Sequence, residues 1–374
     1  MKKIKVLEFA DCINKDDFID TIIQFSNSEK FQVDVCVRTL NSNIAEPVFS
    51  PRTSVFLIPG LNKSRIFFSS WKLFQLLRRL EIDILHAHHF DQIIIGWLAT
   101  RLHKKTKLVI GRHYSDSLYR MPNDLRKSIY FFLEKLANRA AWRIVVPSIQ
   151  IRNILIQQAV PEKKIQVIYY GFNLQKYKAL NSEEVLKLRS EFGLDGKIVL
   201  GCFARLHEEK GHRYLLDAVC KISRTVKNLR VLFIGEGPER SAIQDLIIKY
   251  DLNDIVTLAG WRMDAIKIMQ SVDIVVQPTL QEAFSQVMCE AMYLGKPLII
   301  SRVSGVEDIV INNFNGIVVE KESVTGLVDG INGLINSSSL REKLGKNAKE
   351  TIIKKLPLHR VIDEYEKLFS ESIL

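Results

Sequence analysis

The segment DIVVQPTLQEAFSQVMCEAMYLGKPLIIS (residues 273–301) carries the clearest fold signal in this 374-residue sequence. It opens with a short apolar run that ends in proline, continues as an amphipathic helical pattern, and closes with a second apolar run, KPLIIS. Two short buried strands joined by a helix are typical of a parallel crossover unit. The segment therefore predicts a parallel sheet covered by helices.

The same alternation of strand and helix patterns extends along the whole chain. Strand-like runs such as FQVDVCVR and DILHAH fill the first half, and runs such as KIVLGCFAR and LRVLFIGEG fill the second. A chain of this length is too long for one ordinary core. We therefore expect an α/β protein of two Rossmann-like domains, each built on a doubly wound parallel sheet.

A change of pattern near residues 175–196 marks the expected join between the two domains. The expected parts are an N-terminal domain at 1–178, a linker at 179–196, a C-terminal domain at 197–356, and a terminal helix at 357–374 that packs back towards the N-terminal domain. Two such domains bind a ligand in the cleft between them, beyond the carboxyl ends of the strands.

The composition is that of a globular protein, with 47% hydrophobic and 25% charged residues. No apolar run reaches the roughly 18 residues of a membrane-spanning helix. The N-terminal sequence MKKIKVLEFADC lacks the long apolar region of a signal peptide. The five cysteines are scattered without a Cys-x-x-Cys pair, as expected for reduced thiols. We therefore expect a cytoplasmic protein.

The net charge of +11 is concentrated in residues 51–150, which hold 17 Lys and Arg against 6 Asp and Glu. Aromatic residues are interleaved with these cations. Solvated helix faces with core aromatics would explain the pattern. An anionic membrane surface would also explain it, because basic amphipathic helices gain about 1 kcal/mol per cation there. No nucleic-acid motif is present, so we expect no nucleic-acid partner and keep a peripheral location at the inner membrane face as an alternative.

Two cations follow the first strand of the second half. Arg205 ends the run KIVLGCFAR, and Lys210 precedes Gly211 at the start of a helical pattern. Arg engages phosphate oxygens in pairs and Lys supplies a point charge, so the loop suits a diphosphate. Ordinary surface charge is the alternative. The later turns Gly235-x-Gly237 and Gly260-Trp261 are weak signals by themselves.

Glu282 and Glu290 flank the start of the helical pattern in the opening segment. If residues 284–292 are helical, the backbone N–H groups near Ser285 and Gln286 form an anion site. Eight helical steps would separate the carboxylates by roughly 12 Å. That exceeds the about 5–9.5 Å between the paired carboxylates of glycoside hydrolases. A nucleotide-sugar would fit instead, with ribose, diphosphate and sugar in a row; a capping and a solvated glutamate are the alternative.

Together these residues resemble the donor-binding domain of the retaining GT-B glycosyltransferases of family 4, also called glycosyl transferases group 1. The resemblance is strong over residues 190–320 and weaker in the first half, through DILHAHH, the Arg-His pair at 112–113 and VIYYGFN. It implies two Rossmann-like domains that face a central cleft. It also implies metal-independent hexosyl transfer from a nucleoside-diphosphate sugar, with no cofactor and with retention of configuration.

The resemblance also implies a role for each motif residue. Arg205 and Lys210 would hold the diphosphate, Glu282 the sugar and Glu290 the ribose, and His113 would lie near the transferred sugar. The implied catalytic residues are His113, Glu282, Arg205 and Lys210. The implied donor-binding residues are Arg205, Lys210, Gly235, Gly260, Trp261, Glu282, Ala283, Phe284, Ser285, Gln286 and Glu290.

The chain departs from the family pattern in three places, one of which is SGVEDIV (residues 304–310), where a Gly-Gly…Pro-Glu pattern is commoner. The first loop, at about residues 10–18, contains no glycine where relatives carry a glycine pair, and Ala283 and Ser285 stand where glycine is commoner.

The run LHAHH places His86 and His88 on one strand face, but the sequence shows no third ligand and the resemblance implies no metal.

The sequence therefore predicts a retaining glycosyltransferase whose acceptor is a saccharide, such as a lipid-linked envelope saccharide. One alternative is a nucleotide-sugar 2-epimerase on the same fold, which would act on the donor alone. The other is a nucleotide-sugar-binding partner subunit without turnover.

Overall fold

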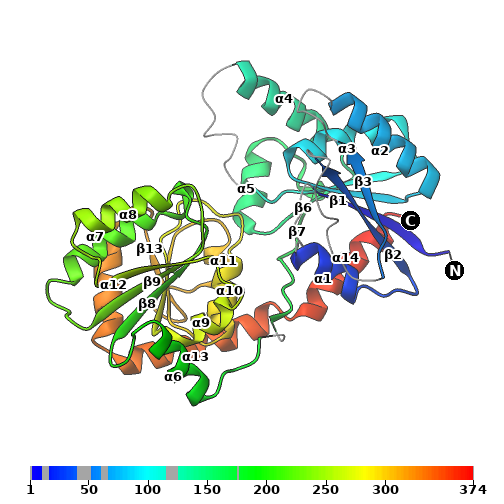
Figure 1. Cartoon of the computed structure of the whole chain (residues 1–374). Helices are drawn as coiled ribbons and strands as arrows, with labels where there is room; N and C mark the ends of the chain where they lie inside the picture. The colour runs from blue at the N-terminus through cyan, green and yellow to red at the C-terminus, as the bar shows by residue number, and fades with distance from the viewer. Residues whose placement is uncertain are drawn as a thin grey trace. The chain divides into compact units, whose positions relative to one another are not determined.

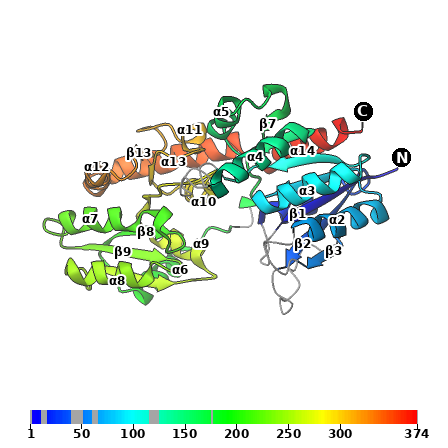
Figure 2. The same cartoon turned by 90° about the horizontal axis from the view of Figure 1, so that it is seen from above.

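The computed structural model describes residues 2–10, 17–39, 52–59, 66–114, 125–174 and 177–373. The chain divides into two compact parts: unit 1, Met1–Asn173 with Leu356–Leu374, and unit 2, Leu174–Lys355. The first and last described residues both belong to unit 1, so its chain leaves for unit 2 and returns (Figure 2).

Unit 1 is built on a parallel sheet, which in the described residues has seven strands in the order β3-β2-β1-β4-β5-β6-β7. Its strands are β1 (Ile4–Ala10), β2 (Phe31–Thr39), β3 (Val55–Pro59), β4 (Ile84–His88), β5 (Lys107–Gly111), β6 (Arg143–Val146) and β7 (Ile165–Val167). Its helices are α1 (Asp17–Phe25), α2 (Ile66–Leu80), α3 (Phe90–Leu102), α4 (Leu125–Ala140), α5 (Ile149–Gln157) and α14 (Leu358–Glu371).

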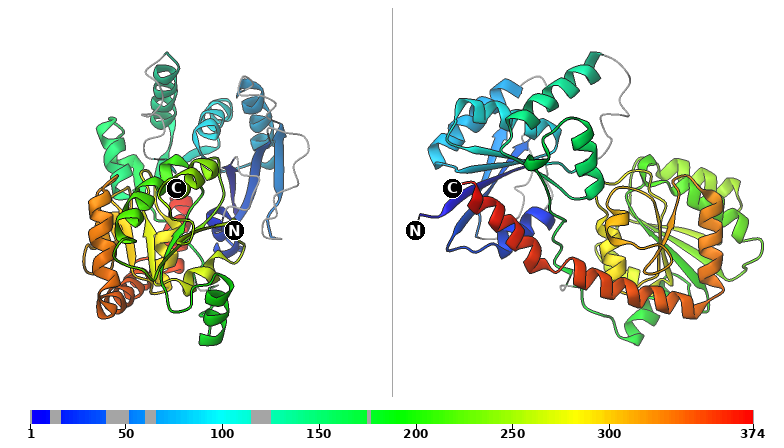
Figure 3. Two further views of the ribbon diagram at one scale, coloured as in Figure 1. Left: turned by 60° about the vertical axis from the view of Figure 1, so that its left-hand side comes forward. Right: turned by 180° about the vertical axis from the view of Figure 1, so that it is seen from behind.

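Helices cover both faces of this sheet. Helices α2, α3 and α4 pack side by side on one face, while α1 and α14 lie together against β1 on the other (Figures 1 and 3). The buried side chains of α1 and α14 join those of β1 and β2 in one apolar core that includes Phe18, Val35 and Phe369. The central strands β1 and β4 are therefore covered on both faces, which also buries their polar side chains Glu8, His86 and His88.

Unit 2 is built on a second parallel sheet, with the order β10-β9-β8-β11-β12-β13 among the described residues. Its strands are β8 (Ile198–Phe203), β9 (Leu229–Ile234), β10 (Val256–Gly260), β11 (Ile274–Gln277), β12 (Leu298–Ser301) and β13 (Ile317–Val319). Its helices are α6 (Ser182–Glu191), α7 (His212–Ile222), α8 (Arg240–Lys249), α9 (Ala265–Ser271), α10 (Gln286–Tyr293), α11 (Val306–Ile309), α12 (Val324–Ile335) and α13 (Ser338–Lys355). Helix α7 packs against α8 and α12, and α10 packs against α13 (Figure 1).

The predicted fold class, two Rossmann-like domains with doubly wound parallel sheets, is confirmed. The segment 273–301 forms the crossover β11–α10–β12, with β11 paired in parallel to β12. In both sheets the strand order reverses direction beside the first strand, between β1 and β4 in unit 1 and between β8 and β11 in unit 2. Ligands of open α/β sheets bind at such switch points, at the carboxyl ends of the strands.

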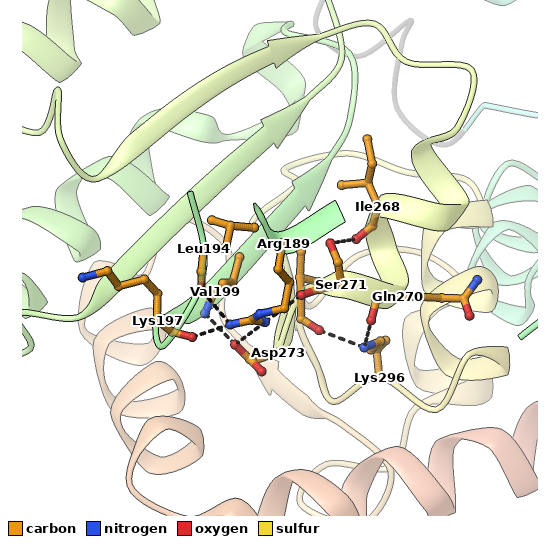
Figure 4. A network of polar contacts seen from close by, with 10 residues as sticks. Arg189, Leu194, Lys197, Val199, Ile268, Gln270, Ser271, Asp273 and Lys296 are labelled. Atoms are coloured by element: carbon orange, nitrogen blue, oxygen red, sulfur yellow. Dashed lines mark hydrogen bonds and ion pairs between the residues drawn. The ribbon is translucent and has the colours of Figure 1, made fainter. Parts of the chain in front are cut away.

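Residues 179–196, expected as a linker, are built into unit 2 through α6. The Arg189 guanidinium donates to the carbonyl oxygens of Ser271, Leu194 and Lys197 at 2.8, 3.0 and 2.6 Å (Figure 4). It also approaches the Asp273 carboxylate at 3.4 Å, and that carboxylate accepts from the Val199 amide at 2.8 Å. The sequence of this segment resembles a linker because its helix has few buried apolar residues, and polar contacts such as those of Arg189 attach it to unit 2.

We expect Arg189→Ala to destabilise unit 2 by at least about 1.5–3 kcal/mol, the contribution of a single hydrogen bond to a charged group. Urea unfolding followed by circular dichroism measures the change. The matched control is Arg302→Ala, because Arg302 also pairs with two carboxylates, Glu307 and Glu320, but at the surface. That control should change stability by less than about 1 kcal/mol. Equal effects of the two variants would contradict the attachment role of Arg189.

Among the described residues, none of the helices combines the length and apolar character needed to span a bilayer.

Candidate active site

The loops at the switch point of unit 2 hold most of the predicted donor-binding residues. After β8 the chain passes through a short 3-10 turn, Glu208–Lys210, and enters α7 at Gly211 in the left-handed conformation, φ 66°. A Cβ on Gly211 would lie 2.1 Å from the Pro278 carbonyl oxygen, so glycine is required for this approach. The Leu280 amide donates to the Glu209 carbonyl at 2.7 Å, which joins the loop after β8 to the loop after β11.

Lys210 and Glu282 meet where these two loops join. The Lys210 Nζ lies 2.5 Å from the Glu282 Oε1, and both side chains are largely buried. Burial raises the pKa of Glu282, while the charge of Lys210 and its hydrogen bond lower it, with a net upward shift. In the structure, Lys210, the predicted phosphate-binding cation, therefore forms an ion pair with Glu282, the predicted sugar-binding carboxylate. Arg205 is 74% exposed by its side chain and pairs with Glu209.

Helix α10 begins at Gln286, so the expected helix over 284–292 starts two residues too early. Ser285 is the N-cap in an extended conformation, and its hydroxyl accepts from the Met288 amide at 3.2 Å. Glu282 therefore lies in the loop before the helix, and a separation counted in helical steps does not apply to it. The Gln286 and Val287 amides are among the first in the helix and have no acceptor within it.

Glu290 lies inside α10 and is only 7% exposed. Its Oε1 accepts hydrogen bonds from the Tyr177 hydroxyl and the Gln286 side-chain amide, both at 2.8 Å. The alternative of a solvated helix glutamate is thus wrong. Sequence reasoning missed Tyr177, because nothing in the run FNLQKYK links it to a residue 113 positions further on.

The remaining predicted donor residues occupy turns around the same edge of the sheet. Gly235 has φ 146°, and a Cβ there would lie 1.9 Å from the Ala204 carbonyl oxygen. Gly260 has φ 74° and accepts from the Gly235 amide at 2.8 Å. Trp261 follows it and is 69% exposed. Phe284 is buried, and Ala283, which precedes it in the loop, is partly exposed.

His113 lies in unit 1, just after β5, in a chain of hydrogen-bonded side chains. Its Nε2 is 2.6 Å from the His88 Nδ1, and its Nδ1 is 2.6 Å from the Tyr170 hydroxyl. The His88 Nε2 lies 2.6 Å from the Glu8 carboxylate, which also binds the His86 Nδ1 at 2.9 Å. Glu8 was missed, although a lone glutamate in the apolar strand IKVLEFA was a signal for it.

Burial and neighbouring groups together set the protonation of Glu8, His88 and His113. Burial raises the pKa of Glu8, but the charge of His86 and the hydrogen bonds from both histidines bring it down to about 2. Burial and the charge of His86 lower the pKa of His88 to about 4, in spite of Glu8. Burial also holds the pKa of His113 well below its usual value. At neutral pH this series of hydrogen-bonded side chains therefore holds an ionised Glu8 beside neutral His88 and His113.

The residues on either side of His113 are fixed by one carboxylate on α4. Arg112 and Glu134 form an ion pair in which both side chains are almost fully buried. The Tyr114 hydroxyl donates to the same Glu134 carboxylate at 2.7 Å, and the Arg112 guanidinium lies 4.5 Å from the Tyr114 ring centre. The backbone that carries His113 is therefore held from both sides.

In the part of the chain that the structure describes, Glu8, His86 and His88 form the group whose atoms could surround a metal ion. Their separations of 2.6 and 2.9 Å are hydrogen-bond distances. Donors around a tetrahedral metal at about 2.0–2.1 Å lie further apart. The present arrangement is therefore a set of hydrogen bonds. Most of the glycine-free first loop lies outside the described residues.

Comparison with known proteins identifies the family. Residues 19–176 match the family model for Glycosyltransferase Family 4, and residues 185–351 match that for Glycosyl transferases group 1. A glycosyltransferase of Methanocaldococcus jannaschii is 30% identical over 296 residues, which cover 78% of this chain and 76% of that protein. The UDP-Gal:alpha-D-GlcNAc-diphosphoundecaprenol alpha-1,3-galactosyltransferase of Escherichia coli is 25% identical over 85% of this chain and 84% of its own.

Among solved structures, the Anabaena protein HepE in complex with UDP-glucose superposes with a TM-score of 0.84. The match covers 98% of this chain and all of HepE, at 20% identity, and so identifies the fold. This chain therefore belongs to the glycosyltransferases of the group 1 and family 4 type and has their two-domain GT-B fold.

Proposed function

We propose that this protein transfers a sugar from a nucleoside-diphosphate sugar to a saccharide or lipid-linked acceptor, with retention of configuration and without a metal ion. The observation that carries the proposal is the Lys210–Glu282 pair at the switch point of unit 2, beside the N-terminus of α10. A cation, a carboxylate and free helical amides at one edge match the phosphate and hydroxyl groups of such a donor.

The ion pair suggests how the donor is received. The diphosphate is the stronger anion and takes Lys210, with Arg205 and the α10 amides binding further phosphate oxygens. Glu282 is then released to accept hydrogen bonds from sugar hydroxyls. Negative charge that develops on the leaving diphosphate is stabilised by these fixed groups, so a divalent cation is not required. Glu290 exchanges its bond from Tyr177 for ribose hydroxyls, and His113 contacts the transferred sugar.

The comparisons support the substrate classes. HepE is solved with UDP-glucose, and the E. coli relative transfers galactose to a diphosphoundecaprenol-linked sugar, as its name states. On α2, Phe67 and Trp71 are exposed, and the Lys72 ammonium lies 5.3 Å from the Trp71 ring centre. Exposed aromatic rings beside a cation are suited to binding an anionic membrane. We therefore include in the proposal an acceptor that is presented at such a membrane.

The test is a panel of nucleoside-diphosphate sugars, each incubated with and without saccharide and lipid-diphosphate acceptors, with release of nucleoside diphosphate as the readout. We expect release that depends on the acceptor, a product whose anomeric configuration by NMR equals that of the donor, and a rate unchanged by EDTA. Conversion of the donor alone to its 2-epimer would identify the epimerase instead. Donor binding without any release would identify a binding subunit.

A further inference from the structure

The side chains of His113, His88 and Glu8 are linked by hydrogen bonds. The donor and the acceptor of each bond follow from the ionised carboxylate of Glu8, at the inner end of the series. A carboxylate only accepts, so the His88 Nε2 must carry a proton and donate it to Glu8. Neutral His88 then presents the lone pair of its Nδ1, and His113 must donate from its Nε2. The His113 Nδ1 is left as an acceptor, and here it receives the Tyr170 hydroxyl.

His86 fixes the inner end of this chain. It lies two residues before His88 on β4, and its Nδ1 binds the same Glu8 carboxylate. All three side chains are almost completely buried against α1 and α14, where the rings of Phe18, Tyr365 and Phe369 cover them. Two donors on one buried carboxylate favour its ionised form, and an ionised carboxylate fixes the direction of every later bond.

Gly111 makes the contact between the two histidines possible. It is the last residue of β5, and a Cβ at this position would lie 2.5 Å from the His88 Nδ1 and 2.7 Å from the His113 Nε2. Any side chain would thus intrude on the hydrogen bond between the rings. Histidines that only fill the core would not require a residue without a Cβ at position 111. The glycine is therefore independent support for a functional contact between the two rings.

We propose that Glu8, His86 and His88 are positioning residues that hold His113 in its Nε2–H tautomer. The His113 Nδ1 then remains an acceptor for a hydroxyl group of the substrate. That hydroxyl takes the place of the Tyr170 hydroxyl. This inference rests on the proposed transferase function. A fixed tautomer matters because the other tautomer would present an N–H to the substrate and lose the bond.

Two pairs of variants test the inference. Gly111→Ala separates the rings without removing any polar group, and its control is Gly96→Ala on α3, where a Cβ would also be crowded, 3.0 Å from Leu85. Glu8→Gln removes the anion, and its control is Asp34→Asn, which removes a buried carboxylate of β2 that binds Gln32 and Ser54.

The first readout is the tautomer of His113 in protein labelled with nitrogen-15 at histidine, assigned by comparison with His113→Asn. We expect the Nε2–H form alone in the wild type and in both controls, and a mixture of tautomers in Gly111→Ala and Glu8→Gln. The second readout is kcat, which should fall by about tenfold to a hundredfold in the two test variants with a nearly unchanged donor KM. The controls should keep the wild-type kcat.

Unchanged tautomers in both test variants would overturn the inference, even if thermal stability fell. A zinc content near one per chain that is lost in His86→Asn would also overturn it, because these residues would then be ligands. The tautomer needs no substrate for its measurement. If no donor is turned over, the proposed function fails, while the spectra still decide whether Glu8 and His88 hold His113.

Discussion

Glu282→Ala is expected to lower kcat by about 10²–10³-fold, the effect of removing one group that acts in the transition state. The affinity for nucleoside diphosphate should stay the same or increase. The reason is the 2.5 Å contact between Glu282 and Lys210, which occupies the cation when no donor is bound. Without the carboxylate, Lys210 is available to the diphosphate from the start. Steady-state kinetics and calorimetric binding of the nucleoside diphosphate measure the two effects.

Lys210→Met provides the converse variant. It should weaken diphosphate binding and kcat together, because it removes the cation and leaves Glu282 buried without its partner. Lys267→Met on the exposed side of α9 is the control for loss of one positive charge in unit 2 and should behave as the wild type. A loss of diphosphate affinity in Glu282→Ala as large as that in Lys210→Met would show that Glu282 serves the phosphates and not the sugar.

The sequence predicted the parts of the fold that depend on local pattern. Alternating apolar runs and helical periodicity predict doubly wound sheets, because a buried parallel strand must be apolar on both faces. The family resemblance implied that Lys210 and Glu282 serve one donor, and they meet because they follow β8 and β11, adjacent strands whose carboxyl ends lie at one edge of the sheet. Local pattern did not predict the start of α10, which depends on the bond from Met288 to Ser285.

Contacts between distant segments could not be predicted in the same way. Glu8 and His88 are 80 positions apart and meet through the register of β1 against β4, in which Glu8 lies opposite His86. The sequence did predict that His86 and His88 share a strand face. The glutamate in IKVLEFA stood out in the sequence, but nothing in the sequence paired it with the two histidines of another strand. A contact between residues this far apart in the sequence becomes visible only when the pairing and register of the strands are known.

Glu134→Ala is expected to destabilise the protein by about 3–5 kcal/mol, the cost of leaving one charge of a buried ion pair without its partner. The Arg112 and Glu134 side chains are only 2% and 3% exposed, so water cannot replace the lost carboxylate. The Tyr114 hydroxyl loses its acceptor as well. Urea unfolding of the wild type and the variant measures the change, with Glu162→Ala as the control, because Glu162 pairs with Arg152 at the surface.

The double variant Arg112→Met, Glu134→Leu separates the cost of an unpaired charge from the value of the pair. Apolar replacement of both partners of a buried pair is often neutral or stabilising, so this variant should recover most of the lost stability. It would not recover a function that needs the loop of His113 held by Tyr114 and α4, because Leu offers no acceptor to the Tyr114 hydroxyl. Stability near that of the wild type with a reduced kcat would therefore show that the buried pair is kept for the position of His113, whereas full activity would make it a feature of the core alone.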